Sequence, residues 1–330
     1  MLTFDQIRRV HVELSTRCNA RCPMCMRNYR GYDYNSGYPL CELSLADFTH
    51  ILPPGRFPGI DTVNFNGNLG DFANAKDAVE IVEYLVDLGV NVAINTNGSL
   101  RSPAWWARLA HPRVTIGFAL DGLADTHSLY RQDTDWARVI ENATAFIKAG
   151  GRAVWRFVPF DHNQHQQDQC EQMSRDLGFI KFENIYDGRE STPVYTRGGE
   201  FSHQIGKPFD ATTPKLKDML TSHVTWFDAK TVKVDRDVAE LKLQCVHKLH
   251  KEIYIAADGS VYPCCFLGFY PATMKHPGNE QLLPMVRENN ALEYDLEHCL
   301  KWFDQVEQSW QADSIANGRL YQCVNSCGRI

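Results

Sequence analysis

The feature that most constrains the fold is an alternation of short β-rich runs and amphipathic segments over the first 190 residues. Each run is rich in β-branched or aromatic residues, and the segments between them, such as 74–88 and 135–149, place apolar residues at helical spacing. Six such units predict a parallel sheet with right-handed crossovers, either open or closed into a full or partial barrel. The predicted strands span residues 9–14, 62–66, 91–95, 114–120, 153–158 and 180–184.

The second half of the chain follows a different pattern. Residues 191–244 are rich in turn formers around a short predicted helix near 214–222, and we interpret them as a connector. Residues 245–330 are predicted to form a small α+β domain. In that domain, alternating runs on either side of Asp258 and Gly259 predict a hairpin, and a helix is expected near 294–311.

Composition limits the class of protein. The 330 residues are 44% hydrophobic and 22% charged, and they contain no uncharged apolar run long enough to span a membrane. The N-terminal residues show no apolar signal core, so we expect a cytoplasmic protein. A formal charge of -6 gives no electrostatic reason to expect a nucleic-acid partner.

Eleven cysteines need a reason in such a chain, because cytosolic thiols stay reduced and seldom form structural disulfides. Metal binding is the leading alternative. Three of the cysteines lie between residues 18 and 25, and six follow residue 244. This distribution predicts two separate sites.

The first cluster is the stretch STRCNARCPMC, which follows the first predicted strand. Pro23 favours a compact loop over a regular helix, and in either form Cys18, Cys22 and Cys25 converge on one side. Ligands of parallel α/β sheets bind where the strands end, so this loop is expected on the functional rim. A [4Fe–4S] cluster normally takes four cysteines, so three thiolates would leave one iron open. A zinc knuckle or simply buried thiols remain alternatives.

These residues resemble the radical S-adenosylmethionine (SAM) superfamily, whose signature is C-x3-C-x2-C after the first strand of a partial (β/α)6 barrel. The resemblance implies a [4Fe–4S] cluster on Cys18, Cys22 and Cys25, with SAM bound at the open iron. It also implies reductive cleavage of SAM to a 5′-deoxyadenosyl radical that abstracts a substrate hydrogen. The residue before the third cysteine is commonly aromatic in the family and is Met24 here.

The same resemblance implies SAM contacts at the ends of later strands. The glycine-rich stretch after the second strand is a variant of the family's form, and Ala119 stands where a serine often contacts the SAM ribose. Asp121 is expected to bind SAM, act as a base or cap the next helix, and Arg131 to reach the SAM carboxylate or form a surface salt bridge. The candidate SAM-binding residues are Gly67, Asn68, Gly70, Asp71, Asn97, Asp121 and Arg131.

Polar residues after the fifth strand face the same rim. Histidines in residues 160–165 are candidates for proton transfer. In the alternative interpretation, Asp161 or Asn163 caps the helix that runs through 166–177.

The C-terminal cysteines form a second pattern. Cys245, thirteen residues, Gly259, four residues and Cys264 resemble the opening of the twitch or SPASM extension of radical SAM enzymes. The resemblance implies one auxiliary [4Fe–4S] cluster on Cys245, Cys264, Cys323 and Cys327. Cys265 and Cys299 are spare and either could replace one of the four. A structural zinc site is the alternative.

The leading function implied by the resemblance is a radical SAM oxidoreductase that oxidises a small molecule, with the auxiliary cluster accepting the substrate electron. One alternative is a peptide maturase that forms thioether or carbon–carbon crosslinks. Another is a non-catalytic iron–sulfur electron carrier or redox sensor. The expected partners are a small-molecule or peptide substrate and a reducing protein such as flavodoxin or ferredoxin.

Overall fold

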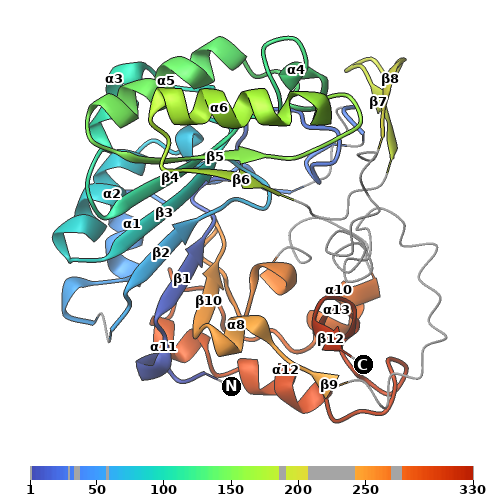
Figure 1. Ribbon diagram of the computed structural model, residues 1–330. Coiled ribbons are helices and arrows are strands. Elements are labelled where there is room, and N and C mark those ends of the chain that lie inside the picture. Colours follow the sequence, from blue (N-terminus) through green and yellow to red (C-terminus); the bar gives the residue numbers. More distant parts are fainter. Residues whose placement is uncertain are drawn as a thin grey trace.

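In the computed structural model of the protein, the described residues are 2–28, 30–32, 38–56, 59–185, 191–206, 242–268 and 277–329. The largest sheet has eight strands in the order β11-β10-β1-β2-β3-β4-β5-β6 (Figure 1). Two small sheets pair β7 with β8 and β9 with β12. The strands are β1 Arg9–Val12, β2 Thr62–Phe65, β3 Asn91–Thr96, β4 Val114–Ala119, β5 Arg152–Phe157, β6 Lys181–Asn184, β7 Thr192–Tyr195, β8 Phe201–Ile205, β9 Lys242–Leu243, β10 Glu252–Ile255, β11 Val261–Tyr262 and β12 Gly328–Arg329.

Helices connect the strands of the large sheet and form most of the C-terminal segment. The α-helices are α1 Leu45–Ile51, α2 Ala78–Asp87, α3 Pro103–Arg108, α4 His127–Tyr130, α5 Trp136–Lys148, α6 Gln167–Leu177, α8 Val246–Leu249, α10 Pro277–Leu282, α11 Leu296–Cys299, α12 Phe303–Ser309 and α13 Tyr321–Cys327. The short 3-10 helices are η1 Phe4–Gln6, η2 Pro54–Arg56, η3 Phe72–Asn74 and η4 Gln164–Gln166.

The six predicted strands are all present and all parallel. β1 to β6 lie in chain order, and each pairs in parallel with the next. The sheet is not closed, because β6 and β11 stand at its two edges. The predicted partial (β/α)6 barrel is therefore confirmed.

The C-terminal hairpin extends this sheet. β10 pairs in parallel with β1, with Val10 opposite Ile253, and β11 pairs antiparallel with β10. The hairpin predicted around Asp258 and Gly259 is thus formed, and it continues the main sheet. The division of the chain at residues 190 and 244 stays a prediction.

One face of the sheet packs against the helices. Alternate residues of the central strands are fully buried, among them Ile116 and Phe118 of β4 and Trp155 of β5. Phe118 contacts Trp106 of α3 and Phe146 of α5. Helices α1, α2, α3, α5 and α6 lie along the outer side of the curved sheet (Figure 1). This apolar layer holds the strand ends, and therefore the loops that follow them, in fixed positions.

Two expectations from the second half of the chain are refined. The helix expected at 294–311 is two helices, α11 and α12, and at the break Trp302 packs against Tyr262 of β11. The interpreted connector contains the β7–β8 hairpin, whereas the helix expected at 214–222 lies outside the described residues. Among the described residues no helix is both long and apolar enough to cross a bilayer.

Candidate functional site

The three-cysteine segment forms a loop of turns shortly after β1, as Pro23 predicted. The backbone N–H of Cys25 donates a hydrogen bond to the carbonyl of Cys22 at 2.9 Å, and the Asn28 side-chain amide donates to the same carbonyl at 3.0 Å. The backbone N–H of Ala20 lies 3.4 Å from Cys18 Sγ. The loop is therefore held by its own hydrogen bonds.

The thiols of this loop are desolvated and close enough to affect one another. Burial raises the pKa of Cys18 well above its usual value, and Asp71, Cys25 and Cys22 raise it further. Burial also raises the pKa of Cys22, an effect that Arg131 opposes. Deprotonating such a group of thiols requires a cation to offset their charge. The cysteines thus have the donor chemistry of an iron–sulfur cluster.

The described side chains that could bind metal lie too far apart to share one metal ion. Among the described residues, no three His, Cys, Asp or Glu side chains converge closely enough to hold a single metal ion. In a [4Fe–4S] cluster each thiolate binds a different iron, so its ligands need not converge on one point. The residues present fit that group.

Arg131 and Asp121 form a buried ion pair beside Cys22. Arg131 Nε donates to Asp121 Oδ2 at 2.5 Å, and Arg131 Nη1 lies 3.8 Å from Cys22 Sγ. The Asp121 side chain is fully buried, and its other oxygen accepts from the backbone N–H of Val158 at 2.7 Å. The next helix, α4, has Thr126 at its N-cap, so Asp121 does not cap it. Asp121 therefore holds the Arg131 guanidinium against the cysteine loop. The alternative in which Arg131 forms a surface salt bridge is not what the structure shows.

Asp71 and Asn97 join the second and third loops to the cysteine loop. The buried Asp71 carboxylate accepts hydrogen bonds from the Thr96 hydroxyl and from the backbone and side-chain amides of Asn97. Burial raises the pKa of Asp71, and these hydrogen bonds oppose that rise. Asn97 Nδ2 lies 3.7 Å from Cys18 Sγ. Both predicted residues therefore lie beside the cysteine loop, linked to each other.

The glycines of the second loop allow the chain to approach itself. A Cβ on Gly70 would lie 1.7 Å from the carbonyl oxygen of Ser15, and one on Gly67 would lie 2.1 Å from that of Gly70. The backbone N–H of Asp71 also donates to the carbonyl of Arg17 at 2.9 Å. Gly70 therefore lets the second loop pack against the residues that precede Cys18, and Gly67 lets that loop turn tightly on itself.

Asn68 reaches in a different direction from the other candidates. Its side-chain amide donates to the Tyr254 hydroxyl at 3.3 Å and to the carbonyl of Cys265 at 3.0 Å. This predicted SAM-binding residue thus connects the second loop to the C-terminal hairpin.

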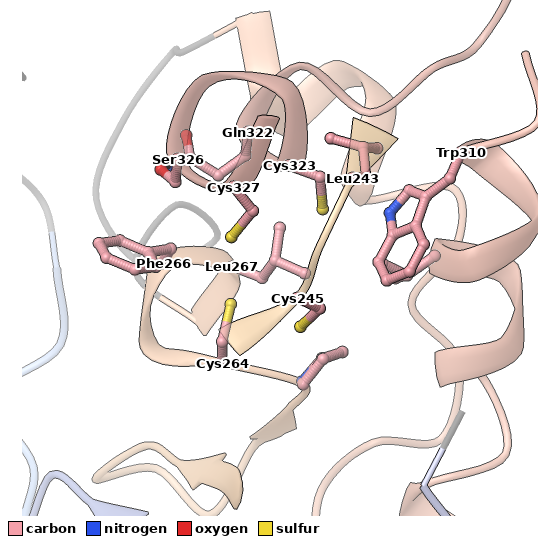
Figure 2. Close-up of a pocket in the computed structure, with 12 residues that line it drawn as sticks. Leu243, Cys245, Cys264, Phe266, Leu267, Trp310, Gln322, Cys323, Ser326 and Cys327 are labelled. Atoms are coloured by element: carbon pink, nitrogen blue, oxygen red, sulfur yellow. Dashed lines mark hydrogen bonds between the residues drawn. The ribbon is translucent and has the colours of Figure 1, made fainter. Parts of the chain in front are cut away.

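The four C-terminal cysteines of the predicted auxiliary site line one pocket, and their sulfurs point toward a common space (Figure 2). The pocket contains about 390 Å³ of space free of atoms, part of it open to solvent. Cys245 is the N-cap of α8, Cys264 follows β11, and Cys323 and Cys327 lie one turn apart on α13. Burial raises the pKa of Cys264 well above its usual value, and neighbouring cysteines add to the rise.

The two spare cysteines lie elsewhere. Neither Cys265 nor Cys299 lines the pocket. Cys265 packs at the main core, and Cys299 is fully buried in α11, with its Sγ 4.0 Å from the carbonyl of Tyr294. The geometry favours the predicted set of four over either replacement.

Comparison with known proteins agrees with both the fold and the first loop. Residues 12–169 match the family described as the Radical SAM superfamily, a stretch that runs from β1 into α6 and includes the three cysteines. These residues therefore form a domain of the radical SAM superfamily. Two curated relatives and one solved structure show how far the likeness extends.

A nucleotide dehydratase of Selenomonas ruminantium that depends on S-adenosylmethionine is 30% identical over 93 residues, which are 28% of this chain and 30% of the relative. A cysteine-type anaerobic sulfatase-maturating enzyme of Clostridium novyi (strain NT) is 24% identical over 197 residues, 54% of this chain and 50% of the relative. The chain thus spans half or less of these relatives.

Streptococcus suis SuiB is a structural neighbour. Its structure bound to S-adenosylmethionine gives a TM-score of 0.60 at 17% identity, with 93% of this chain and 68% of SuiB covered. Its structure bound to precursor peptide SuiA gives a TM-score of 0.60 at 16% identity, with 97% of this chain and 71% of SuiB covered. At this identity the likeness shows the fold.

Glu13 is a residue of the radical SAM domain that sequence reasoning missed. It follows β1 and is 2% exposed. Its Oε1 accepts hydrogen bonds from the backbone N–H groups of Leu69 and Gly70, and its Oε2 accepts from the Tyr254 hydroxyl. Burial raises the pKa of Glu13, and these hydrogen bonds oppose the rise. A carboxylate at the end of the run RVHVEL was the available signal.

The β7–β8 hairpin covers the cysteine loop of the radical SAM domain, which the connector interpretation did not foresee. Val194 and Ile205 are fully buried in a small apolar cluster with Cys22. Tyr130, Val158 and Phe160 complete this cluster, and Met24 packs against it. The alternation in TPVY and FSHQI was the sequence signal. The hairpin therefore shields one side of the candidate cluster site from water.

A polar belt crosses the sheet face that lies opposite the helices. Arg156 of β5 contacts Asn95 of β3 across Gly117 of β4, and its Nε lies 3.6 Å from Glu183 Oε2 on β6. A Cβ on Gly117 would lie 2.6 Å from Arg156 Cδ and 2.8 Å from Asn95 Oδ1, so only glycine leaves room for this crossing. The Arg156 side chain remains 31% exposed.

The rim segment after β5 is held by Asn163. Its side chain is fully buried, accepts from the backbone N–H of Phe160 at 2.7 Å and donates to the carbonyl of Val158 at 3.0 Å. Asn163 therefore braces the turn, and its side chain makes no cap bond to η4. His162 stacks on Phe160, and burial lowers its pKa. Proton transfer by this histidine stays a prediction.

Proposed function

We propose that this protein cleaves SAM reductively at the Cys18, Cys22 and Cys25 loop and abstracts a hydrogen from a peptide substrate. In this proposal Cys245, Cys264, Cys323 and Cys327 hold an auxiliary [4Fe–4S] cluster. The observation that carries it is the presence of two different cysteine sets in one chain. Three cysteines lie on the rim of a partial barrel, and four line one mainly apolar pocket.

When bound, the first cluster and SAM supply a 5′-deoxyadenosyl radical for hydrogen abstraction, and an auxiliary cluster supplies an electron acceptor. Arg131 lies against Cys22 and is oriented by Asp121, so a positive charge offsets the negative charge of the thiolates. Glu13 holds the second loop by two backbone N–H groups. The apolar cluster around Val194 and Ile205 keeps water away from Cys22.

The choice of a peptide rests on the relatives. The sequence slightly favoured a small molecule, whereas the Clostridium novyi relative matures a sulfatase and SuiB is solved with a precursor peptide. The partly exposed belt of Asn95, Arg156 and Glu183 offers both hydrogen-bond donors and hydrogen-bond acceptors to a peptide backbone. Reduction by a flavodoxin or ferredoxin in the cytoplasm completes the proposal.

A small-molecule substrate is the second candidate. It is supported by the Selenomonas ruminantium relative, which is a nucleotide dehydratase. A nucleotide would use the Arg156 guanidinium to bind phosphate.

The test is anaerobic reconstitution of the full chain, followed by reduction and incubation with SAM. The proposal expects about eight irons per chain, four for each cluster, and 5′-deoxyadenosine among the products. A protein that holds iron and sulfide yet forms no 5′-deoxyadenosine would be an electron carrier or sensor. Zinc without acid-labile sulfide would overturn both sites.

Substrate class is tested in the same assay. Short peptides encoded beside the gene are added in one arm and nucleoside triphosphates in the other, and the products are weighed by mass spectrometry. Loss of two hydrogens from a peptide supports crosslinking or oxidation. Loss of water from a nucleotide supports the second candidate and overturns the first.

A further inference from the structure

The pocket that holds the four C-terminal cysteines is mainly apolar. Its described lining contains Leu243, Phe266, Leu267 and Val306 and no charged side chain. The lining amide of Gln322 already donates to the Ser326 hydroxyl at 2.6 Å. A cluster in this pocket would therefore meet few groups able to stabilise its negative charge.

Trp310 is the exception. It directly follows α12 and lines the pocket, with its indole nitrogen turned toward Cys323 of α13 (Figure 2). Trp310 Nε1 is buried and has no partner of ordinary hydrogen-bond geometry among the described residues. A buried donor without a partner destabilises the fold, so the N–H group needs an acceptor.

Cys323 is the acceptor within reach. Cys323 and Trp310 line the same pocket, and the indole nitrogen of Trp310 faces the sulfur of Cys323 across it (Figure 2). The indole N–H is therefore placed to stabilise negative charge on Cys323 Sγ.

Trp302 provides an internal comparison. Its Nε1 is also buried without a partner, and its side chain is 3% exposed. However, Trp302 packs against Tyr262 and Phe303 and does not line the cysteine pocket. The two tryptophans thus differ in whether the side chain lines the cysteine pocket.

We propose that the Trp310 indole N–H donates a hydrogen bond to the Cys323 sulfur when the auxiliary cluster is bound, and that this bond raises the reduction potential of that cluster. The inference rests on the auxiliary cluster of the proposed function. Reduction adds one electron, and part of its charge resides on the cysteine sulfurs. A fixed donor therefore stabilises the reduced form more than the oxidised form.

The parent for the test is the full chain with Cys18, Cys22 and Cys25 replaced by alanine, so that only the auxiliary cluster can form. Trp310→Phe and Trp302→Phe are made in this parent. The reduction potential of each is measured by anaerobic titration followed by electron paramagnetic resonance. Trp310→Phe is expected to shift the redox equilibrium about tenfold toward the oxidised cluster, which lowers the potential by about 59 mV for one electron. Trp302→Phe should leave the potential unchanged.

A second measurement needs no substitution at Trp310. In the reduced parent labelled with indole-¹⁵N tryptophan, one nitrogen and one solvent-exchangeable proton should couple magnetically to the cluster. Both couplings should persist in Trp302→Phe. A cluster-containing parent without these couplings, or an unchanged potential in Trp310→Phe, overturns the inference alone. A parent that binds no cluster overturns the auxiliary site of the proposed function, and the inference with it.

Discussion

The two cysteine sites of this protein differ in the number of thiols and in their surroundings. The rim site has three cysteines and a charged setting, in which Arg131 contacts Cys22 and Asp121 holds Arg131. The inner site has four cysteines within an apolar lining, with Trp310 as the donor facing a cysteine. In the function we propose, the first arrangement would leave a coordination position for a ligand, whereas the second would supply all four ligands of a cluster from protein sulfur.

This difference suggests how one chain separates two tasks. A site that binds a charged small molecule needs fixed charges and access, which loops at the ends of parallel strands provide. A site that only carries electrons needs complete ligation and exclusion of water, which apolar side chains provide. Asn68 connects the two regions, because it links the second loop to the carbonyl of Cys265, next to Cys264.

The largest expected effect distinguishes the two cysteine sites by the step of the reaction that each supports. Cys22→Ala should reduce 5′-deoxyadenosine formation by more than ~100-fold, because the cluster loses one of its three protein ligands. Loss of a group that only orients a metal ligand typically costs ~100-fold at most. Cys264→Ala should leave SAM cleavage in place while product formation from substrate fails. Both quantities are measured by chromatography of the same anaerobic reactions.

Cys299→Ala is the matched control for this comparison, because Cys299 is buried in the same segment but outside the pocket. It should retain both SAM cleavage and product formation. Undiminished cleavage in Cys22→Ala would show that the rim site is wrongly assigned. Loss of product in Cys299→Ala but not in Cys264→Ala would show the same for the inner site.

The next effect tests the charged setting of the rim site. Asp121→Ala should lower the free energy of unfolding by about 3 kcal/mol, because it leaves the mostly buried Arg131 without its carboxylate. Denaturant unfolding of the apoprotein measures this change. Glu171→Ala, which breaks an exposed ion pair with Arg175 on α6, should change it by about 0.5 kcal/mol or less. Equal effects of the two substitutions would contradict the buried, charged setting that we assign to the rim site.

The third effect is a pH dependence of the rim. His127 is fully buried, its Nδ1 accepts from the backbone N–H of Asp121 and its Nε2 lies 3.0 Å from the Thr134 hydroxyl. Burial lowers the pKa of His127 from 6.5 to about 4, so below pH 6.5 the unfolded chain binds a proton that the folded chain does not. The free energy of unfolding should therefore fall by about 3 kcal/mol between pH 6.5 and 4, with no contribution from His127 above that window.

The measurement is denaturant unfolding across this pH range. His127→Gln should be less stable at pH 7, because it loses two hydrogen bonds, but should show a shallower decline toward pH 4. His250→Gln, at an exposed position, should keep the slope of the unmodified protein. An identical slope in His127→Gln would exclude His127 as the source of the dependence.

Much of the fold was predictable because the spacing of apolar residues along the chain indicates each strand and helix locally. The strand predicted at 62–66 is Thr62–Phe65, the strand predicted at 114–120 is Val114–Ala119, and the cysteine loop lies on the expected rim. The addition of β10 beside β1 was not predictable, because pairing between segments so far apart in sequence depends on how the whole chain packs. The roles of Glu13 and of the β7–β8 hairpin depend on the same packing.

The amino-acid sequence alone determined the order of strands and helices, the loop that carries Cys18, Cys22 and Cys25, and the spacing of the later cysteines, because each of these is a local pattern. Only the tertiary structure decided that Asp121 binds Arg131 instead of capping a helix. It also decided that Cys245, Cys264, Cys323 and Cys327, and neither Cys265 nor Cys299, share one pocket. The physical reason is that residues far apart in the sequence come together only when the surfaces that carry them are buried against each other. A local sequence pattern does not determine which surfaces these are.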